Sequence, residues 1–547
     1  MYNKDVKMGN KPSLLLMTSR SAGGFNIAPP LGLYRLKNFI QQDVSTCDIL
    51  DFDLENENEY LGKAEQGKYD IIGMSVSHIN MVMDLETLVR FRHAAQVSGK
   101  RVLFIAGGQE AALNYTQWLQ SNLVDVIFLG FAERSLQKFC SNLGRIGKEA
   151  PLKDIAKDIK GLSFCAETGE VLHIPSNVLT EEEFELLSFD NVMTMDIPYE
   201  IYWNKMRLER ARINTNTEFV FKTARLYTSS HCPRRCGFCS SQSFITSSQK
   251  NVSPIFSITA EQIYEIVKHY ARRYEAEGFL FSDDDFPIGT LDGIERVRRF
   301  CRLIIDAKHT GNLPDKLKFF CQSRVADFLD NKTVRHDLIK LMREAGFDNT
   351  GLGIETLSNR LLKAPSVNKT GVTVSDCKAV IDALLEEGVI PIIFIIIGIP
   401  ESSVGELEET ICEVADYIRK GVDVAVTARL RVNPGSPLCE CGSYPISSTA
   451  WVSPVNGKTL LVADYFIPWN PIIEMIIGKV QEKAEEEVRL LCAKYGWNKS
   501  MAPKTIVGIA TLIATARLIN REDIVEKFIV LLRDIVDNQS SLLRENR

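Results

Sequence analysis

The chain has 547 residues, which is too long for one ordinary domain and predicts two or three. A hydrophobic content of 45% and a charged content of 24% indicate a globular protein with a substantial core. The formal net charge of −6 and the lack of a Lys/Arg-rich run argue against a dedicated nucleic-acid binder. Thirteen cysteines spread over the whole chain are too few for a disulfide scaffold.

The sequence shows no pattern of a targeting or membrane-spanning segment. Residues 1–11 are polar and lack the apolar stretch of a signal peptide. The longest apolar runs, residues 389–400 and 506–519, are shorter than the ~18 residues that a spanning helix needs. We therefore expect a soluble, cytoplasmic protein with no membrane partner.

Short apolar strands alternate with helices in residues 1–185. We predict strands over 13–17, 46–52, 69–77, 101–106 and 124–130, and helices over 29–40, 85–96, 111–119 and from 132 onward. Such alternation makes a doubly wound parallel sheet, which binds ligands at the carboxyl ends of its strands. Small residues fall at these ends: Ser75, Ser77, Gly107, Gly108 and Gly130. They either admit a ligand or form tight turns.

The next part of the chain connects two domains. Residues 161–174 predict a hairpin, because a Thr-Gly turn separates two short apolar runs. Residues 186–222 are rich in aromatic side chains and carry no recognisable chemical motif. We interpret residues 186–222 as a linker.

Three cysteines at C-x3-C-x2-C spacing, Cys232, Cys236 and Cys239, follow a short strand at residues 224–227. Three thiolates without a fourth nearby indicate an iron–sulfur cluster with one iron left open. A structural zinc site would need four ligands, usually in two pairs, and the pair Cys439 and Cys441 is too tightly spaced to complete one. The alternative is three ordinary thiols in a loop.

This motif resembles that of the radical S-adenosylmethionine (SAM) enzymes. The resemblance implies that Cys232, Cys236 and Cys239 bind three irons of a [4Fe–4S] cluster, while SAM chelates the fourth iron. It also implies that Phe238 lies near the adenine of SAM. The reduced cluster of such enzymes cleaves SAM and gives a 5′-deoxyadenosyl radical.

Residues 223–437 then predict six strand–helix units. The expected strands are 224–227, 279–282, 317–321, 350–354, 390–397 and 422–428. Six units fit the partial (β/α)6 barrel of radical SAM enzymes better than a closed eight-fold barrel. Residues 438–547 predict a C-terminal helical domain, with helices over 472–477, 480–495, 505–519 and 522–536.

Polar residues at the ends of the barrel strands are candidates for SAM binding. The predicted set is Asp283, Asp284, Ser323, Arg324, Glu355 and Gly398. By resemblance, Asp283 or Asp284 contacts the amino group of SAM, and Gly398 lies beside the adenine. Arg324 can bind the SAM carboxylate as a bidentate donor. The run of three aspartates from Asp283 also allows a divalent-metal site or a solvated turn.

The N-terminal domain resembles the cobalamin-binding domain that precedes many radical SAM barrels. The resemblance rests on the Pro-Pro-Leu-Gly-Leu run, the Gly107-Gly108 turn and the segment 129–133. It implies that cobalamin is bound by Ser75, Ser77, Gly107, Gly108, Gly130 and Glu133. The chain lacks the Asp-x-His-x-x-Gly motif after its first strand, so we expect His-off binding, or a domain that has lost cobalamin. His78 is either a lower-face group or a surface residue.

The resemblance implies a cobalamin-dependent radical SAM methyltransferase. It would act on an unactivated carbon of a small molecule or peptide, using a 5′-deoxyadenosyl radical and methylcobalamin, with flavodoxin or ferredoxin as electron donor. The alternatives are a radical rearrangement, ring contraction or cyclisation without methyl transfer, and a cobalamin- or redox-sensing module. A methylthiotransferase is disfavoured, because its additional cluster cysteines and RNA-binding domain are not visible.

Overall fold

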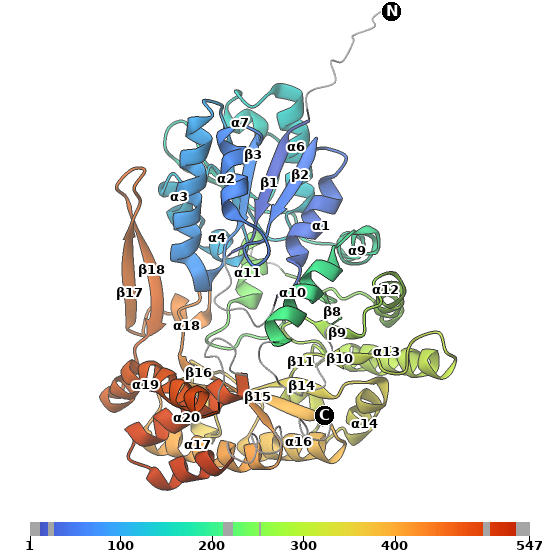
Figure 1. The fold of residues 1–547 in the computed structure, drawn as a ribbon, viewed down its shortest axis with the longest axis vertical. Helices are drawn as coiled ribbons and strands as arrows, with labels where there is room; N and C mark the ends of the chain where they lie inside the picture. Colours follow the sequence, from blue (N-terminus) through green and yellow to red (C-terminus); the bar gives the residue numbers. More distant parts are fainter. Residues whose placement is uncertain (1–10, 20–26, 212–221, 251–252, 496–503, 532–547) are drawn as a thin grey trace, which may run out of the picture.

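The computed structural model describes residues 11–19, 27–211, 222–250, 253–495 and 504–531 (Figure 1). Its N-terminal part contains a seven-stranded sheet in the order β2-β1-β3-β4-β5-β6-β7. The strands are β1 (Ser13–Met17), β2 (Thr46–Leu50), β3 (Ile71–Ser75), β4 (Leu103–Gly107), β5 (Val126–Phe128), β6 (Leu162–Cys165) and β7 (Val171–Ile174). The pairs among β1 to β5 are parallel, whereas β6 and β7 are antiparallel.

Helices cover both faces of this sheet, as the strand–helix alternation predicts (Figure 1). Helices α1 (Leu31–Ile40) and α6 (Glu133–Ile146) lie on one face, and α2 (Glu57–Glu65) and α3 (Met81–Val97) on the other. Strand β1 is apolar along its length because alternate side chains enter the cores on the two faces. The order β2-β1-β3 places the topological switch point of the sheet between β1 and β3.

Two details of this domain differ from the expectation. The helix predicted over 111–119 is two short helices, α4 (Gln109–Leu113) and α5 (Tyr115–Gln120), because Asn114 between them leaves the helical conformation with φ −109°. Helix α2 was not predicted, since its sequence is mostly polar and only Tyr60 and Ala64 are buried. The predicted hairpin at 161–174 is confirmed as β6 and β7, which extend the same sheet.

The six predicted strand–helix units of residues 223–437 are confirmed. The strands are β8 (Thr223–Leu226), β9 (Gly278–Phe281), β10 (Lys318–Phe320), β11 (Gln322–Arg324), β14 (Asn349–Glu355), β15 (Ile390–Gly398) and β16 (Asp423–Arg429). They pair in parallel in the orders β10-β9-β8 and β11-β14-β15-β16. Only Cys321 separates β10 from β11, so one run of chain joins the two sheets into a partial barrel.

Most helices of this barrel begin at a residue whose side chain caps them. The barrel helices are α11 (Ser241–Ser248), α12 (Ala260–Arg273), α13 (Leu291–His309), α14 (His336–Ala345), α15 (Asn359–Lys363), α16 (Val374–Glu386) and α17 (Val404–Arg419). Thr259 and Ser403 each form a capping box at the start of α12 and α17. Short helices lead from the N-terminal sheet into the barrel: α7 (Leu152–Ile155), α8 (Glu181–Glu185), α9 (Asn191–Thr194) and α10 (Tyr199–Ala211).

The end of the chain is helical, as expected, but a hairpin precedes its helices. After α18 (Pro437–Glu440) come β17 (Ile446–Val452), β18 (Thr459–Phe466), α19 (Pro471–Tyr495) and α20 (Lys504–Leu518). Helix α19 is continuous where we expected two helices: Gly478 disfavours the helical conformation but does not interrupt it. Residues 522–531 are helical, and the remainder of the helix predicted to 536 lies outside the described residues.

The β17–β18 hairpin ties the barrel to the N-terminal sheet domain. Figure 1 shows it rising from the barrel side along helix α3. At its tip, the hydroxyl of Ser453 donates to the backbone carbonyl of Ser121 at 2.9 Å. The side-chain amide of Asn456 donates to the backbone carbonyl of Gln120 at 2.9 Å. Leu460 joins the apolar core on that side of the sheet. In the described part of the chain, no helix is long and apolar enough to cross a membrane.

Candidate active site

A cavity of ≈ 730 Å³ lies between the carboxyl ends of the N-terminal strands and the cysteine loop. The sheet contributes the loops after β1, β3, β4 and β5, with Ser19, Ser77, Gly108 and Gly130 among the lining residues. The barrel contributes the segment that includes Cys239. The ligand-binding edge of a doubly wound sheet therefore faces the predicted cluster site across one shared space.

The predicted cobalamin residues divide into cavity-lining and packing positions. Ser75, Ser77, Gly108 and Gly130 line the cavity, whereas Gly107 is not among the lining residues. Gly108 has φ +93°, and a Cβ there would approach the carbonyl of Val76 at 2.8 Å, so close packing of the chain already requires glycine at 108.

Glu133, at the start of α6, forms a buried ion pair with Arg35 at 2.8 Å. Arg35 lines the cavity and Glu133 does not, so Glu133 fixes the position of a cavity-lining guanidinium. Residues 20–24 and the side chain of His78 lie outside what the structure describes.

The three predicted cluster cysteines sit in the loop between β8 and α11. Cys232 is buried, and Cys236 and Cys239 are partly buried. Burial raises the pKa of Cys232 to about 12 and that of Cys239 to about 11. The backbone N–H of Ser241 points at the sulfur of Cys239 at 3.5 Å. Since burial disfavours a lone thiolate, these sulfurs need a positive partner such as iron in order to ionise.

The donor set fits a multi-iron cluster better than a single ion. Within the described residues, no three His, Cys, Asp or Glu side chains gather around one ion position. A cluster in which each thiolate binds a different iron does not require its cysteines to meet at one point. Cys236 also raises the pKa of both Cys232 and Cys239, so the three thiols lie within electrostatic reach of one another.

Later parts of the barrel hold the cysteine loop by its backbone. The side-chain amide of Asn368 donates to the carbonyl of Arg235 at 2.7 Å, and that of Asn433 donates to Phe238 at 2.8 Å. The N–H of Leu438 donates to the carbonyl of Gly237 at 2.8 Å. No local pattern identifies Asn368 or Asn433, which act over 133 and 195 residues of sequence separation.

Replacing Gly237 with alanine is expected to displace this loop. A Cβ at Gly237 would lie 2.0 Å from the carbonyl oxygen of Pro365 and 2.6 Å from that of Ser366, and neither is a flexible side chain. We expect a loss of about 1–3 kcal/mol in the free energy of unfolding together with reduced iron content after reconstitution. Gly405→Ala is the control, because nothing lies within 4 Å of a Cβ there. Normal iron content and stability in Gly237→Ala would contradict the geometry.

The three adjacent aspartates have three different environments. Asp283 is buried and accepts hydrogen bonds from the backbone and hydroxyl groups of Thr228 and Ser229. Asp284 lines the cavity and accepts a hydrogen bond from the hydroxyl of Ser241. Asp285 is turned into the protein, where burial raises its pKa well above the usual range. The described residues therefore give no support to a shared divalent-metal site at these positions.

The other predicted SAM residues lie inside the barrel. Ser323 is buried, with its hydroxyl 3.3 Å from that of Thr350. Arg324 borders a second, small cavity of ≈ 10 Å³ with Lys369, a residue that our sequence reasoning missed. Lys369 donates to Glu355 at 2.7 Å, and this pair is almost fully buried.

Two of these positions have unusual backbone requirements. Glu355 has φ +69°, a left-handed conformation that non-glycine residues rarely adopt, next to an irregularity in the β14–β15 register. Such strain is typical of functional sites and is held here by the ion pair with Lys369. At Gly398, a Cβ would meet the carbonyl of Ala428 at 2.6 Å and the side chain of Ile477 at 2.6 Å, so helix packing also requires glycine there.

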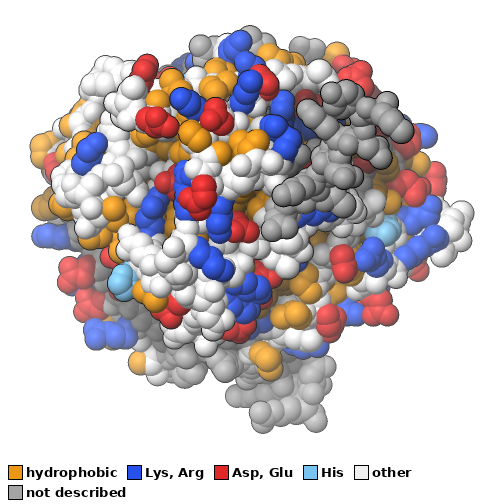
Figure 2. Space-filling view, turned by 90° about the horizontal axis from the view of Figure 1, so that it is seen from above, with side chains coloured by type: hydrophobic (Ala, Val, Ile, Leu, Met, Phe, Trp, Pro, Cys, Tyr) orange, Lys and Arg blue, Asp and Glu red, His pale blue; other side chains and the backbone are white. Residues whose placement is uncertain are grey.

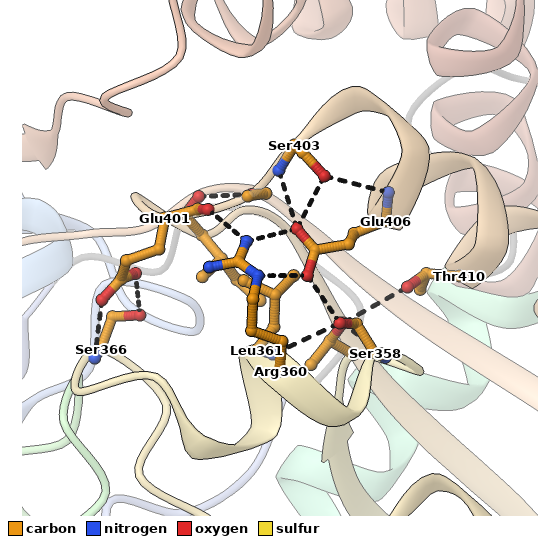
Figure 3. A network of polar contacts seen from close by, with 11 residues as sticks. Ser358, Arg360, Leu361, Ser366, Glu401, Ser403, Glu406 and Thr410 are labelled. Carbon is orange, nitrogen blue, oxygen red and sulfur yellow. Dashed lines mark hydrogen bonds and ion pairs between the residues drawn. The ribbon is translucent and has the colours of Figure 1, made fainter.

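A polar network behind the cysteine loop supports the segment that touches Gly237. Figure 3 shows the carboxylate of Glu401 bound by the backbone and hydroxyl groups of Ser366, and Arg360 bridging the backbone carbonyl of Glu401 to the carboxylate of Glu406. The hydroxyl of Tyr444 also donates to Glu401, at 2.6 Å. The end of β15 and the start of α17 thereby hold the chain against which the loop packs.

This network predicts a dependence of stability on acid pH. Burial alone would raise the pKa of Glu406, but hydrogen bonds from Arg360, Ser403 and Ser358 lower it to about 2. A pKa below the unfolded value means that the stabilisation is present above pH 4.5 and is lost as the pH falls towards 2. We expect Glu406→Gln to abolish this acid-dependent loss of stability. The loss is at most about 1 kcal/mol, because Arg360 is largely exposed.

Thermal melts between pH 7 and pH 3 measure this effect. Glu386→Gln, an exposed substitution at the end of α16, is the control and should melt with the same acid dependence as the wild type. The prediction fails if Glu406→Gln also retains the full acid dependence.

Comparisons with known proteins agree with this geometry. Residues 226–413 match the model of the radical SAM superfamily. No curated protein matches the sequence. The structure is similar to that of the cobalamin-dependent S-adenosylmethionine radical enzyme OxsB with aqua-cobalamin and S-adenosylmethionine bound. The TM-score is 0.66 and the identity 15%, over 97% of this chain and 75% of that chain.

A second similar structure is the radical S-adenosylmethionine methyltransferase TsrM from Kitasatospora setae, with tryptophan substrate and the SAM analog aza-SAM bound. The TM-score is 0.61 and the identity 14%, over 94% of this chain and 98% of that chain. Identities this low show a common fold and do not fix the reaction. The family match and the two shared folds together identify residues 226–413 as a radical SAM domain, in a chain that has the overall fold of OxsB and TsrM.

Proposed function

We propose that this protein is a cobalamin-dependent radical SAM C-methyltransferase acting on an unactivated carbon of a small molecule or peptide. The observation that carries the proposal is the single cavity shared by the carboxyl edge of the N-terminal sheet and the cysteine loop. Two cofactors bound on these opposite sides would face one substrate. The fold of TsrM, a methyltransferase, supports this assignment.

The residues of this chain would hold the cofactors and control access to them. Cys232, Cys236 and Cys239 would ligate the cluster, and Asp284 would position the amino group of SAM. When bound, the cluster and SAM supply a 5′-deoxyadenosyl radical and cobalamin supplies the methyl group. The cavity-lining segments that contain Ser75 and Gly108 would hold cobalamin without a histidine ligand. The protein contributes orientation and exclusion of water.

The wider setting follows from the same chemistry. A cluster that must be reduced needs an electron donor such as flavodoxin or ferredoxin. Thiolate ligands persist in a reducing compartment, so we propose the cytoplasm. On the face of the molecule shown in Figure 2, basic and acidic side chains are interspersed. We propose no nucleic-acid or membrane partner.

Anaerobic reconstitution with iron, sulfide and cobalamin tests this function. We expect cluster and cobalamin absorbance, 5′-deoxyadenosine on reduction with SAM, and, with the correct substrate, a product heavier by one methyl group. A product without added mass would assign a rearrangement or cyclisation instead. Failure to retain cobalamin would overturn methyl transfer, and a complete lack of 5′-deoxyadenosine would overturn the enzyme and favour a sensor.

A further inference from the structure

Arg225 reaches the shared cavity from the first strand of the barrel. In β8, Ala224 and Leu226 are buried in the core, so the alternate residue Arg225 and the following Tyr227 face the opposite side. Both line the cavity. The proposals above give neither residue a role.

The guanidinium of Arg225 has no partner among the described residues. Arg35, which also lines the cavity, is paired with Glu133 at 2.8 Å, but no described acceptor bonds to Arg225. Burial lowers the pKa of Arg225. The titratable groups that act on it are the phenols of Tyr227 and Tyr199, which are uncharged at neutral pH. An arginine stays charged even in such a site, so it needs an anion.

The acidic groups around the cavity are already bound elsewhere. Asp283 accepts its hydrogen bonds from Thr228 and Ser229, and Asp284 accepts one from Ser241. No carboxylate of the described lining pairs with Arg225. The missing anion would therefore come from a bound molecule.

We propose that Arg225 binds a carboxylate or phosphate group of the substrate, which makes the substrate an anionic molecule. This inference rests on the proposed function. The planar guanidinium binds either anion with two parallel hydrogen bonds, and the phenol of Tyr227 adjoins the same wall. SAM also carries a carboxylate, for which Arg324 is the candidate predicted from the sequence, so SAM forms a separate arm of the experiment.

Anion binding to the full chain tests the proposal without requiring cofactors or turnover. Inorganic phosphate, acetate and SAM are titrated separately by calorimetry into the wild type, Arg225→Met and Arg225→Lys. The control is Arg302→Met, at an exposed position on outer helix α13. Circular dichroism melts establish that each variant is folded.

We expect phosphate or acetate to bind the wild type and Arg302→Met alike, and Arg225→Met to bind at least about tenfold more weakly. Arg225→Lys keeps the positive charge but loses the planar guanidinium, so its affinity for phosphate or acetate should lie between those of the wild type and Arg225→Met. If Arg225→Met does not fold, this intermediate affinity of Arg225→Lys is the test. The affinity for SAM should change less than twofold.

An unchanged affinity of Arg225→Met for both small anions overturns the proposal, and so does a wild type that binds neither. A parallel loss of SAM affinity also overturns it, because the carboxylate would then be that of SAM. The titrations with phosphate and acetate need neither cluster nor cobalamin, so their failure is distinct from a failure to form 5′-deoxyadenosine; the SAM titration uses the reconstituted protein.

Discussion

Cys236→Ala is expected to abolish SAM cleavage and to leave the reconstituted protein without its cluster absorbance. Two remaining thiols cannot hold three irons, and the sulfurs of Cys232 and Cys239 are buried enough that ionisation without a cluster is unfavourable. We expect 5′-deoxyadenosine formation to fall by about 1,000-fold or more, to the level of a protein without cofactor.

Iron content, absorbance and 5′-deoxyadenosine are measured on the same anaerobic preparations. Cys412→Ala, on the outer barrel helix α17, is the matched control and should retain all three. A Cys236→Ala protein that still makes 5′-deoxyadenosine at the wild-type rate would refute the cluster assignment.

Asp283→Ala is expected to have the largest effect on stability. Its buried carboxylate accepts four donors from Thr228 and Ser229, which form the start of the cysteine loop. Burial raises the pKa of Asp283, and the charge of Arg296 opposes that shift. Removing the carboxylate leaves these donors and a buried guanidinium uncompensated, which costs about 3–5 kcal/mol.

Chemical denaturation measures this loss, and iron content after reconstitution shows whether the loop is still formed. Asp283→Asn keeps the shape of the side chain and one acceptor oxygen, so it should lower the free energy of unfolding by less than Asp283→Ala does. Asp315→Ala, at an exposed position, should be neutral. A fully stable Asp283→Ala would show that the loop does not depend on this carboxylate.

The experiment on Asp283 also bears on SAM binding. Our sequence reasoning left Asp283 and Asp284 equivalent as partners of the SAM amino group. Both carboxylates line the cavity, but Asp283 is saturated by hydrogen bonds from the loop, whereas Asp284 has a single hydroxyl partner. We therefore propose Asp284 for contact with SAM and Asp283 for positioning the loop, and SAM titration of Asp284→Asn would test the first role.

The sequence by itself determined the order of the elements and the cysteine motif. Strand–helix alternation, capping boxes and C-x3-C-x2-C spacing are local patterns, because each depends on residues within a few positions of one another. They were sufficient to predict the parallel sheet, the six barrel units and the loop that carries Cys232, Cys236 and Cys239. The hairpin at 446–466 escaped prediction because its first strand, β17, is largely exposed and lacks an apolar alternation.

Only the tertiary structure decided which residues share a space. Asn368 and Asn433 meet the cysteine loop from 133 and 195 residues away, and Lys369 finds Glu355 inside the barrel. Arg225 is one arginine among many in the sequence, and its lack of an acidic neighbour appears only when the chain is folded. Burial and pairing depend on what the fold brings together, and these contacts leave no local pattern in the sequence.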